Sequence, residues 1–396
     1  MLKKLLPLCL ILTWLSLAIG WATPSLLRAS SVQQQIEALI HEKEAAVNAK
    51  EKSRFLSVIN PSYPFYVQEQ KRWYDDAVRW IDPGSYRLRL ISVIPEREHQ
   101  LRAWIEQSYR RKGKVHTTHF PLLFQETESG WKDSDYPFHT VARENVVVRY
   151  TESGWGEQAS IALEAAHKAV HQLKKKMDWK PKHPVEVKIY HKPEWFRQSV
   201  KLSLPKWAGG WHEAGESIKL IGARGYTDQQ LTTSGFVHEV THMMVSDLTG
   251  DNAAYWLQEG AAEYYQSHLL PGLRTQQAKK NDQPQWKMSR LEQINLERLG
   301  DKEAKDYYFQ CYRFFRYMIE TYGEEKMRHL FSVLALSPEV DQDTGEKLTQ
   351  VNRRTREAIK KVFGKTLEQL EQDWVADMKK RGKEQSDESI QEHFGG

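Results

Sequence analysis

The sequence predicts an α+β protein, and three observations lead to that prediction. Apolar and polar residues alternate in short runs between residues 86 and 124, which is typical of strands with one buried face. A second group of strand patterns lies between residues 145 and 221, and from Asp228 onward the pattern is almost entirely helical. We therefore expect a domain with a helix on a curved sheet, followed by a domain with a small mixed sheet and a mostly helical C-terminal half.

The composition suits a globular protein and argues against a nucleic-acid partner. The chain has 396 residues, of which 40% are hydrophobic and 28% are charged, and this length is enough for two domains. Its 57 Lys and Arg residues exceed its 52 Asp and Glu residues by five, and the charges are spread along the whole length. Because nucleic-acid binding needs clustered cations, we predict no nucleic-acid partner.

Residues 1–30 predict export from the cytoplasm. Two lysines precede an uncharged, largely apolar run from Leu5 to Ala22, which is the pattern of a secretory signal peptide or of an uncleaved N-terminal anchor. The sequence leaves both open. Since no second run of this length follows, we expect a secreted or cell-surface protein that meets the membrane only through this segment. The two cysteines, Cys9 and Cys311, give no disulfide framework.

The first folded domain is predicted to cover residues 31–142. A helix pattern runs from residue 31 to residue 60, where Asn60-Pro61 ends it. Strand patterns follow at Tyr86–Leu90, Leu101–Ile105 and Val115–Phe124, with a hairpin turn at Arg110–Gly113. This pattern is similar to the cone-shaped fold of ketosteroid-isomerase-like and nuclear-transport-factor-like domains. We interpret Asp133 and Asp135 as turn and surface acids.

The second folded domain is predicted to cover residues 145–378, and a polar tail at 379–396 follows it. The predicted elements are a strand at Asn145–Tyr150, a long amphipathic helix at about 157–177, and strands at Val185–Tyr190 and Glu216–Ile221. Helices then occupy the rest of the domain.

A helix predicted at Phe236–Leu248 carries two histidines four residues apart, His238 and His242. Residues at this spacing share one helix face, so two imidazoles can reach one metal ion while Glu239 projects beside the open position of the metal. These residue types are those of a zinc hydrolase. Because the motif is short enough to arise by chance, the prediction needs a further ligand.

Glu259 is the predicted third ligand. It lies in the segment Trp256–Tyr264, and sixteen residues separate it from His242. A turn between the two helices lets the second fold back onto the first. Two imidazoles and one carboxylate leave zinc a fourth position for water, as in catalytic sites. Glu263, one turn after Glu259, can hold the outer nitrogen of a ligating histidine, for which His238 is the candidate.

These two segments resemble the gluzincin zinc metallopeptidases of the thermolysin-like clan, and in particular the bacterial peptidase MA-like domains with a Trp-Leu-x-Glu-Gly-x-Ala segment. The likeness covers about residues 145–378. It implies that His238, His242 and Glu259 hold one Zn²⁺ ion and that Glu239 is the general base. The chain lacks the Gly-Ala-Met-Glu-Asn segment of the aminopeptidase branch, which argues against an aminopeptidase.

Tyr308 is the candidate for the electrophile that stabilises the oxyanion during hydrolysis. By resemblance, it lies in a helix after the zinc site, much as a tyrosine donor does in related enzymes. A core role stays open, because Tyr308 also belongs to an apolar stripe with Cys311 and Phe315. The resemblance further implies that the strand at 216–221 presents an edge to an extended substrate. We assign the other histidines, among them His212, to surface or packing roles.

Together these residues predict an exported zinc metallopeptidase that hydrolyses peptide or protein substrates, with water activated by zinc and Glu239. Two other functions stay open. One is an exported zinc-binding sensor or interaction protein without catalysis, and the other is a zinc hydrolase that acts on a non-peptide amide or ester.

Overall fold

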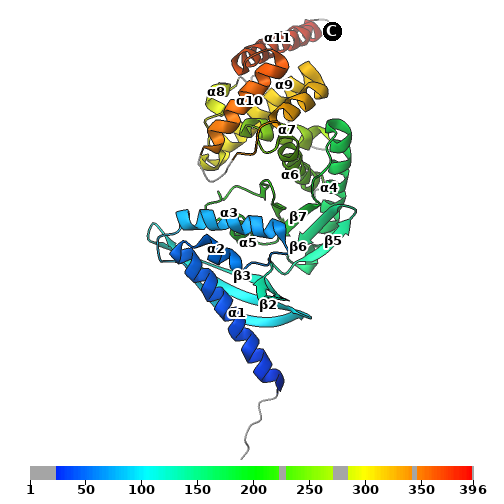
Figure 1. Ribbon diagram of the computed structural model, residues 1–396. Helices are drawn as coiled ribbons and strands as arrows, with labels where there is room; N and C mark the ends of the chain where they lie inside the picture. The colour runs from blue at the N-terminus through cyan, green and yellow to red at the C-terminus, as the bar shows by residue number, and fades with distance from the viewer. Residues whose placement is uncertain (1–23, 223–228, 271–283, 341–345, 395–396) are drawn as a thin grey trace, which may run out of the picture.

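The computed structural model shows the predicted α+β protein (Figure 1). It describes residues 24–222, 229–270, 284–340 and 346–394, with side chains in these ranges except at 24–30, 229–234 and 382–394. In Figure 1 the chain passes from a sheet with its helices at the bottom, through a second sheet, to a group of helices at the top, where the C-terminus lies.

The first sheet is a four-stranded antiparallel meander in the order β1-β2-β3-β4. Its strands are β1 (Arg87–Arg97), β2 (Gln100–Arg111), β3 (Lys114–Thr127) and β4 (Gly130–Asp133). The helices α1 (Pro24–Ala49), α2 (Lys52–Ser57) and α3 (Pro64–Trp80) pack with it around a core in which Phe55 stacks on Trp73. The predicted hairpin turn is confirmed, because Lys112 and Gly113 both have the positive φ that a tight hairpin requires.

The single helix predicted for residues 31–60 is wrong. Lys50 has a φ of 60°, so α1 ends at Ala49 and α2 begins at Lys52. The third helix, α3, also packs with the sheet, where the sequence predicts only one helix. Apolar residues continue on both sides of the break, so their spacing does not reveal it.

The second sheet has five strands in the order β5-β6-β7-β9-β8. The strands are β5 (His139–Arg143), β6 (Val146–Tyr150), β7 (Val185–Tyr190), β8 (Gly210–Trp211) and β9 (Ile218–Ile221). β6, β7 and β9 are parallel, whereas β5 and β8 run antiparallel to their neighbours. Three helices accompany them, η1 (Ser153–Trp155), α4 (Gly156–Met177) and α5 (Pro193–Val200). α4 makes the crossover from β6 to β7, and alanines form most of its buried face.

Two sequence-based assignments change at this sheet. β5 pairs with β6, so most of it, which the sequence assigns to the first domain, belongs to the second sheet. The strand predicted at 216–221 is not an edge, because β9 pairs with β7 on one side and with β8 on the other. Within the described strands, β8 is the edge on this side of the sheet, and the loop 212–217 connects it to β9.

The C-terminal half is helical. Its helices are α6 (Gln229–Thr249), α7 (Tyr255–His268), α8 (Met288–Leu291), η2 (Leu296–Arg298), α9 (Asp301–Leu334), α10 (Lys347–Phe363) and α11 (Leu367–Phe394). α9 bends at Gly323, which has a φ of 79°. α11 continues through most of the segment that the sequence predicts as a polar tail, 379–396, so that segment is helical as far as Phe394.

Asp133 and Asp135 are buried, so their interpretation as surface acids is wrong. Asp133 lies 2.5 Å from Nζ of Lys43 and accepts a hydrogen bond from the hydroxyl of Tyr66. Asp135 lies 2.6 Å from Nζ of Lys188 on β7. A buried carboxylate needs such a partner, and in both cases the partner is distant in the sequence.

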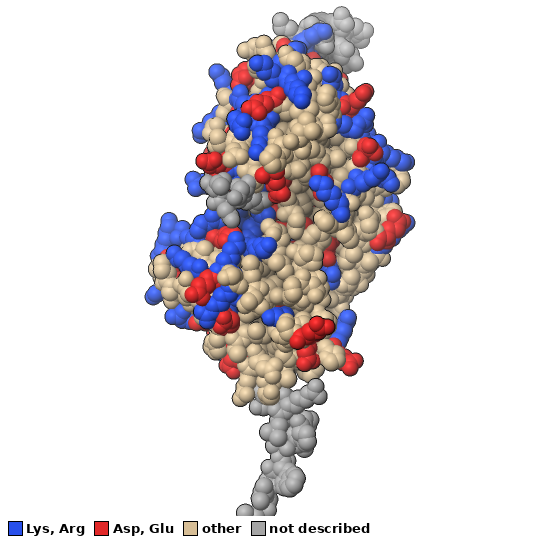
Figure 2. All heavy atoms as spheres, viewed as in Figure 1, with Lys and Arg blue, Asp and Glu red and all other residues tan. Residues whose placement is uncertain are grey.

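The described surface carries charges of both signs (Figure 2), and the described helices include no candidate for a membrane span. On the face shown in Figure 2, basic and acidic side chains are interspersed over the upper part of the molecule and over its lower part. Among the described helices, none combines the length and the apolar character needed to cross a bilayer. The apolar run Leu5–Ala22, on which the export prediction rests, lies outside the described residues.

Gly260 lets α7 lie close against α9. A Cβ atom at this position would lie 2.7 Å from the carbonyl oxygen of Cys311 and 2.9 Å from Cβ of Phe315, both on α9. Because one of these atoms belongs to the backbone, a side-chain rotation cannot relieve the contact. The glycine therefore sets the distance between the two helices.

We predict that Gly260→Ala lowers the free energy of unfolding by about 1–3 kcal/mol, since it overpacks this contact. Urea unfolding followed by circular dichroism measures the change. The control is Gly235→Ala on α6, where an added Cβ meets nothing within 4 Å. That variant should keep its stability or gain up to about 1 kcal/mol. Equal stabilities of the two variants would contradict the prediction.

Candidate metal centre and active site

His238 and His242 lie on α6 with their ring nitrogens facing each other. They are four residues apart, which places them on one helix face. Their Nε2 atoms are 3.1 Å apart, and each side chain is only 13% exposed. The two imidazoles can therefore bind the same metal ion on the cavity side of α6.

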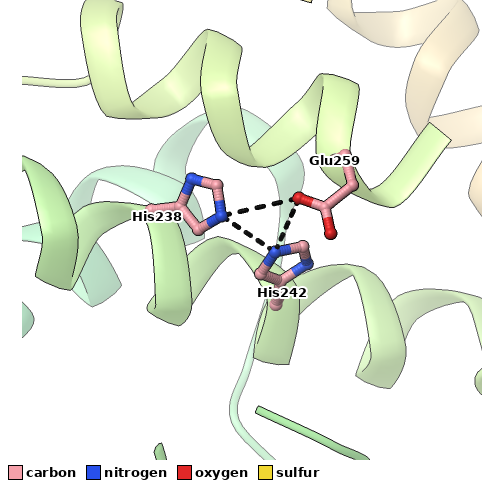
Figure 3. A group of neighbouring side chains, drawn as sticks. All are labelled: His238, His242 and Glu259. Atoms are coloured by element: carbon pink, nitrogen blue, oxygen red, sulfur yellow. Dashed lines mark hydrogen bonds and ion pairs between the residues drawn. The ribbon is translucent and has the colours of Figure 1, made fainter. Parts of the chain in front are cut away.

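A reversal of the chain after α6 brings in the third side chain. Gly250 and Asp251 both have positive φ, and the backbone N–H of Asp251 donates to the carbonyl of Ser246, which ends the helix. α7 then runs back along α6. Figure 3 shows the result, with Oε2 of Glu259 3.3 Å from Nε2 of His242 and 3.6 Å from Nε2 of His238.

The three ligand atoms fit a tetrahedral zinc ion. With zinc–ligand bonds of about 2 Å, neighbouring ligand atoms of a tetrahedron lie about 3.3 Å apart, and the three separations here are 3.1, 3.3 and 3.6 Å. Oε2 of Glu259 is buried and has no hydrogen-bond partner among the described residues, which is costly unless a cation lies beside it. In the described parts of the chain, these side chains form the group of three that could hold a metal ion.

Two further carboxylates border this group. Oε1 of Glu263, one turn after Glu259, lies 3.5 Å from Nδ1 of His238, the nitrogen that faces away from the ligand atoms. Glu239 lines the cavity. A Cβ atom on Gly210 of β8 would overlap with Oε1 of Glu239, so the edge strand passes directly beside this carboxylate.

The carboxylates and imidazoles shift one another's pKa values. Burial lowers the pKa of His238, but Glu259, Glu263 and Glu239 outweigh it and raise that pKa to about 9. Burial raises the pKa of Glu259, but the two histidines outweigh it and lower that pKa to about 2. For Glu239 burial dominates and raises the pKa, so this carboxylate has an increased affinity for a proton.

The site opens into a cavity of about 270 Å³. Apolar side chains line one part of it, and charged or hydroxyl-bearing side chains line another. The apolar part includes Leu204, Trp207, Ile294 and Leu296, and the polar part includes Glu213, Ser246, Asp251 and Lys347. A cavity with one apolar part and convergent polar groups is typical of a site for an organic ligand.

Tyr308 lines this cavity. Its ring centroid lies 6.2 Å from that of His238 and 6.5 Å from that of Trp207. The neighbouring residues Tyr307 and Cys311 belong to the hydrophobic core instead. The sequence leaves open whether Tyr308 lies at the active site or in the core. In the structure its side chain lies in the wall of the cavity.

The cavity also contains residues that the sequence does not predict for the site. His212, which we assign to a surface or packing role, lines the cavity, and burial together with the neighbouring His242 lowers its pKa to about 3. Gly210, Glu213 and Lys347 come from the edge strand, its loop and α10. None of these three residues has a fixed spacing from the metal motif. The Gly209-Gly210 pair is the only local feature of the sequence that points to any of them.

The comparison with protein families supports a metallopeptidase-like enzyme. A family model of the Peptidase MA superfamily matches residues 165–380, which is more than half of the chain. The chain therefore belongs to the Peptidase MA superfamily, a group of peptidase-type enzymes that are generally zinc-dependent. The match includes both helices that carry the candidate ligands. None of the curated proteins compared with the chain matches it.

We predict that His238 stays protonated in the metal-free protein up to a pKa of about 9. The pKa of an unfolded histidine is about 6.5. The stabilising contribution of this proton is therefore fully present below about pH 6.5 and is lost as the pH rises through the folded-state pKa. An NMR titration of the imidazole signals after chelation measures this pKa.

Glu263→Gln removes one of the carboxylates that raise this pKa and should lower it. Glu164→Gln, on the exposed face of α4, is the control and should leave it unchanged. A His238 signal that titrates near the value of an unfolded histidine would show that the carboxylates do not act on this ring as described.

Proposed function

We propose that the protein is a zinc-dependent metallopeptidase of the gluzincin type that hydrolyses peptide bonds outside the cytoplasm. The observation that carries the proposal is the meeting of the His238, His242 and Glu259 ligand atoms on the wall of a cavity that Glu239 also lines. Membership of the Peptidase MA superfamily supports the peptidase activity. The two imidazoles and one carboxylate support zinc as the metal.

Each side chain of the site has a role in this proposal. Zinc held by the three ligands would acidify a water molecule and polarise the scissile carbonyl. Glu239 would accept the proton of the attacking water and later pass it to the leaving amine, and its raised pKa suits both transfers. Tyr308 would donate a hydrogen bond to the oxyanion. Glu263 would orient the ring of His238 through Nδ1.

The edge strand β8 is the proposed platform for the substrate. Gly210 lies on β8 directly beside Glu239, and in the described structure β8 pairs only with β9. An extended peptide that added to this edge would lie next to the proposed general base. Backbone pairing is independent of the side chains, so the apolar part of the cavity would contribute the specificity.

Two other parts of the proposal rest on the N-terminal residues. Residues 1–30 support export, with a signal peptide or an anchor as the route. The helices α1 to α3 on a four-stranded antiparallel sheet support a cone-shaped domain like those of the ketosteroid-isomerase-like proteins.

Glu239→Gln tests the proposal. The wild-type protein should contain one zinc ion per chain and cleave members of a proteome-derived peptide library, as read by mass spectrometry. The variant should keep its zinc and lose cleavage by a factor of about 10²–10⁴, the usual contribution of a general base. Glu259→Ala should lose both cleavage and zinc, because it removes a metal ligand.

The matched control is Glu164→Gln, which changes an exposed glutamate that pairs with Arg143 and Lys168. It should keep both zinc and cleavage. Equal cleavage by Glu239→Gln and the wild type would contradict the proposed peptidase activity of this site. A wild type that binds zinc and cleaves no peptide would favour the zinc-binding sensor or a hydrolase of non-peptide amides or esters.

We further predict that Gly210→Ala lowers kcat by about tenfold or more, because the added methyl group would displace the Glu239 carboxylate and small misplacements of a catalytic group are costly. Steady-state kinetics on a cleaved peptide measure the effect. Gly209→Ala is the control, since an added Cβ there meets nothing within 4 Å. Zinc content should be the same in both variants, and equal kcat values would exclude this role of Gly210.

A further inference from the structure

Helix α3 of the first sheet docks against the loop 212–217 of the second sheet. Glu69 on α3 accepts hydrogen bonds from the backbone N–H of Ser217, at 3.2 Å, and from its hydroxyl, at 2.5 Å. One turn later Nε of Arg72 donates to Oε1 of Glu216 at 2.5 Å, and Nη1 of the same guanidinium lies 3.3 Å from Oε2 of Glu213. One face of α3 therefore contacts the loop at three positions.

These contacts are buried and their charges are compensated. The side chains of Glu69 and Glu216 are each 1% exposed, and that of Arg72 is 18% exposed. Nζ of Lys188 on β7 lies 2.8 Å from Glu69, and Nζ of Lys219 on β9 lies 3.4 Å from it. Because a buried ion that loses its partner is strongly destabilised, these pairs resist separation of α3 from the loop.

The loop that α3 holds is also a wall of the proposed active site. His212, Glu213 and Ala214 line the cavity. Just before the loop, Gly210 lies against the carboxylate of Glu239. A displacement of the loop would therefore move both the edge strand and the side chains that face a bound substrate.

A second contact links the loop to the C-terminal helices. Glu213 lies 3.7 Å from Nζ of Lys347 on α10, and the same Nζ lies 2.6 Å from Asp251 in the turn between α6 and α7. Glu213 thus lies between two cations, Arg72 on α3 and Lys347 on α10. Of these side chains, Glu213, Lys347 and Asp251 line the polar part of the cavity.

We propose that Arg72 is a positioning residue, through which the N-terminal helices hold the β8–β9 loop in the place that substrate binding needs. The proposal rests on the proposed peptidase function for its kinetic part. Arginine suits this role because one planar guanidinium can bind two carboxylates, Glu213 and Glu216, from separate nitrogens. Lysine would offer a single ammonium group, so it could replace only part of the bridge.

The test compares three variants of the full-length protein: Arg72→Met, Arg72→Lys and the control Arg102→Met. Arg102 is also a partly buried arginine of the first sheet, but the carboxylate with which it pairs is Glu96, at 2.7 Å, and not a residue of the loop. We measure zinc content, hydrogen exchange of the backbone amides of residues 212–217, and kcat and KM for a peptide that the wild type cleaves.

Arg72→Met should keep its zinc, exchange the loop amides about tenfold faster or more, and raise KM by a similar factor with a smaller change in kcat, because the loop shapes the binding wall. Arg72→Lys should lie between this variant and the wild type. Arg102→Met should leave loop exchange and KM unchanged. If Arg72→Met does not fold, the comparison of Arg72→Lys with the control decides.

Unchanged exchange of residues 212–217 in the Arg72 variants would overturn the proposal, and so would faster exchange with an unchanged KM, which would limit Arg72 to a role in stability. A wild type that binds zinc but cleaves nothing would count against the proposed function instead. In that case the affinity for a peptide hydroxamate replaces KM, and a wild-type-like affinity of Arg72→Met would overturn the positioning role.

Discussion

The close packing of α7 on α9 is the contact on which the candidate metal site depends. Glu259 directly precedes Gly260, whose missing side chain allows α7 to approach the backbone of α9. The carboxylate therefore extends from a backbone position that helix packing determines. Both metal-site helices and α9 contribute to one continuous hydrophobic core. A rigid support of this kind holds ligand atoms at the separations that a metal ion requires.

Charge compensation explains why this position suits a cation. Buried carboxylates elsewhere in the described structure have a lysine or arginine beside them, as Asp133 has Lys43 and Glu69 has Lys188. Around His238 and His242 three carboxylates gather instead, and their neighbours are imidazoles, which can be neutral. A bound divalent cation would compensate these carboxylates, and it would replace the proton that His238 otherwise holds because the carboxylates raise its pKa.

The first sheet and its helices take part in the architecture of the cavity. Glu69 and Arg72 reach from α3 to the loop after β8, and Lys188 and Lys219 reach from the second sheet to Glu69. The aromatic core of the first sheet also includes Trp195 and Phe196 of α5. The edge of the second sheet beside the active site thus rests on residues from both parts of the chain.

The sequence by itself determined the features that depend on near neighbours along the chain. These are the α+β class, the hairpin turn at Lys112 and Gly113, and the shared helix face of His238 and His242. The tertiary structure alone decided the break of the first helix, the burial of Asp133 and Asp135, the identity of β8 as the edge strand, and the direction of Tyr308. The physical reason is that residue spacing records which side chains share a face. It contains no record of the distant lysine, strand or helix that will meet that face.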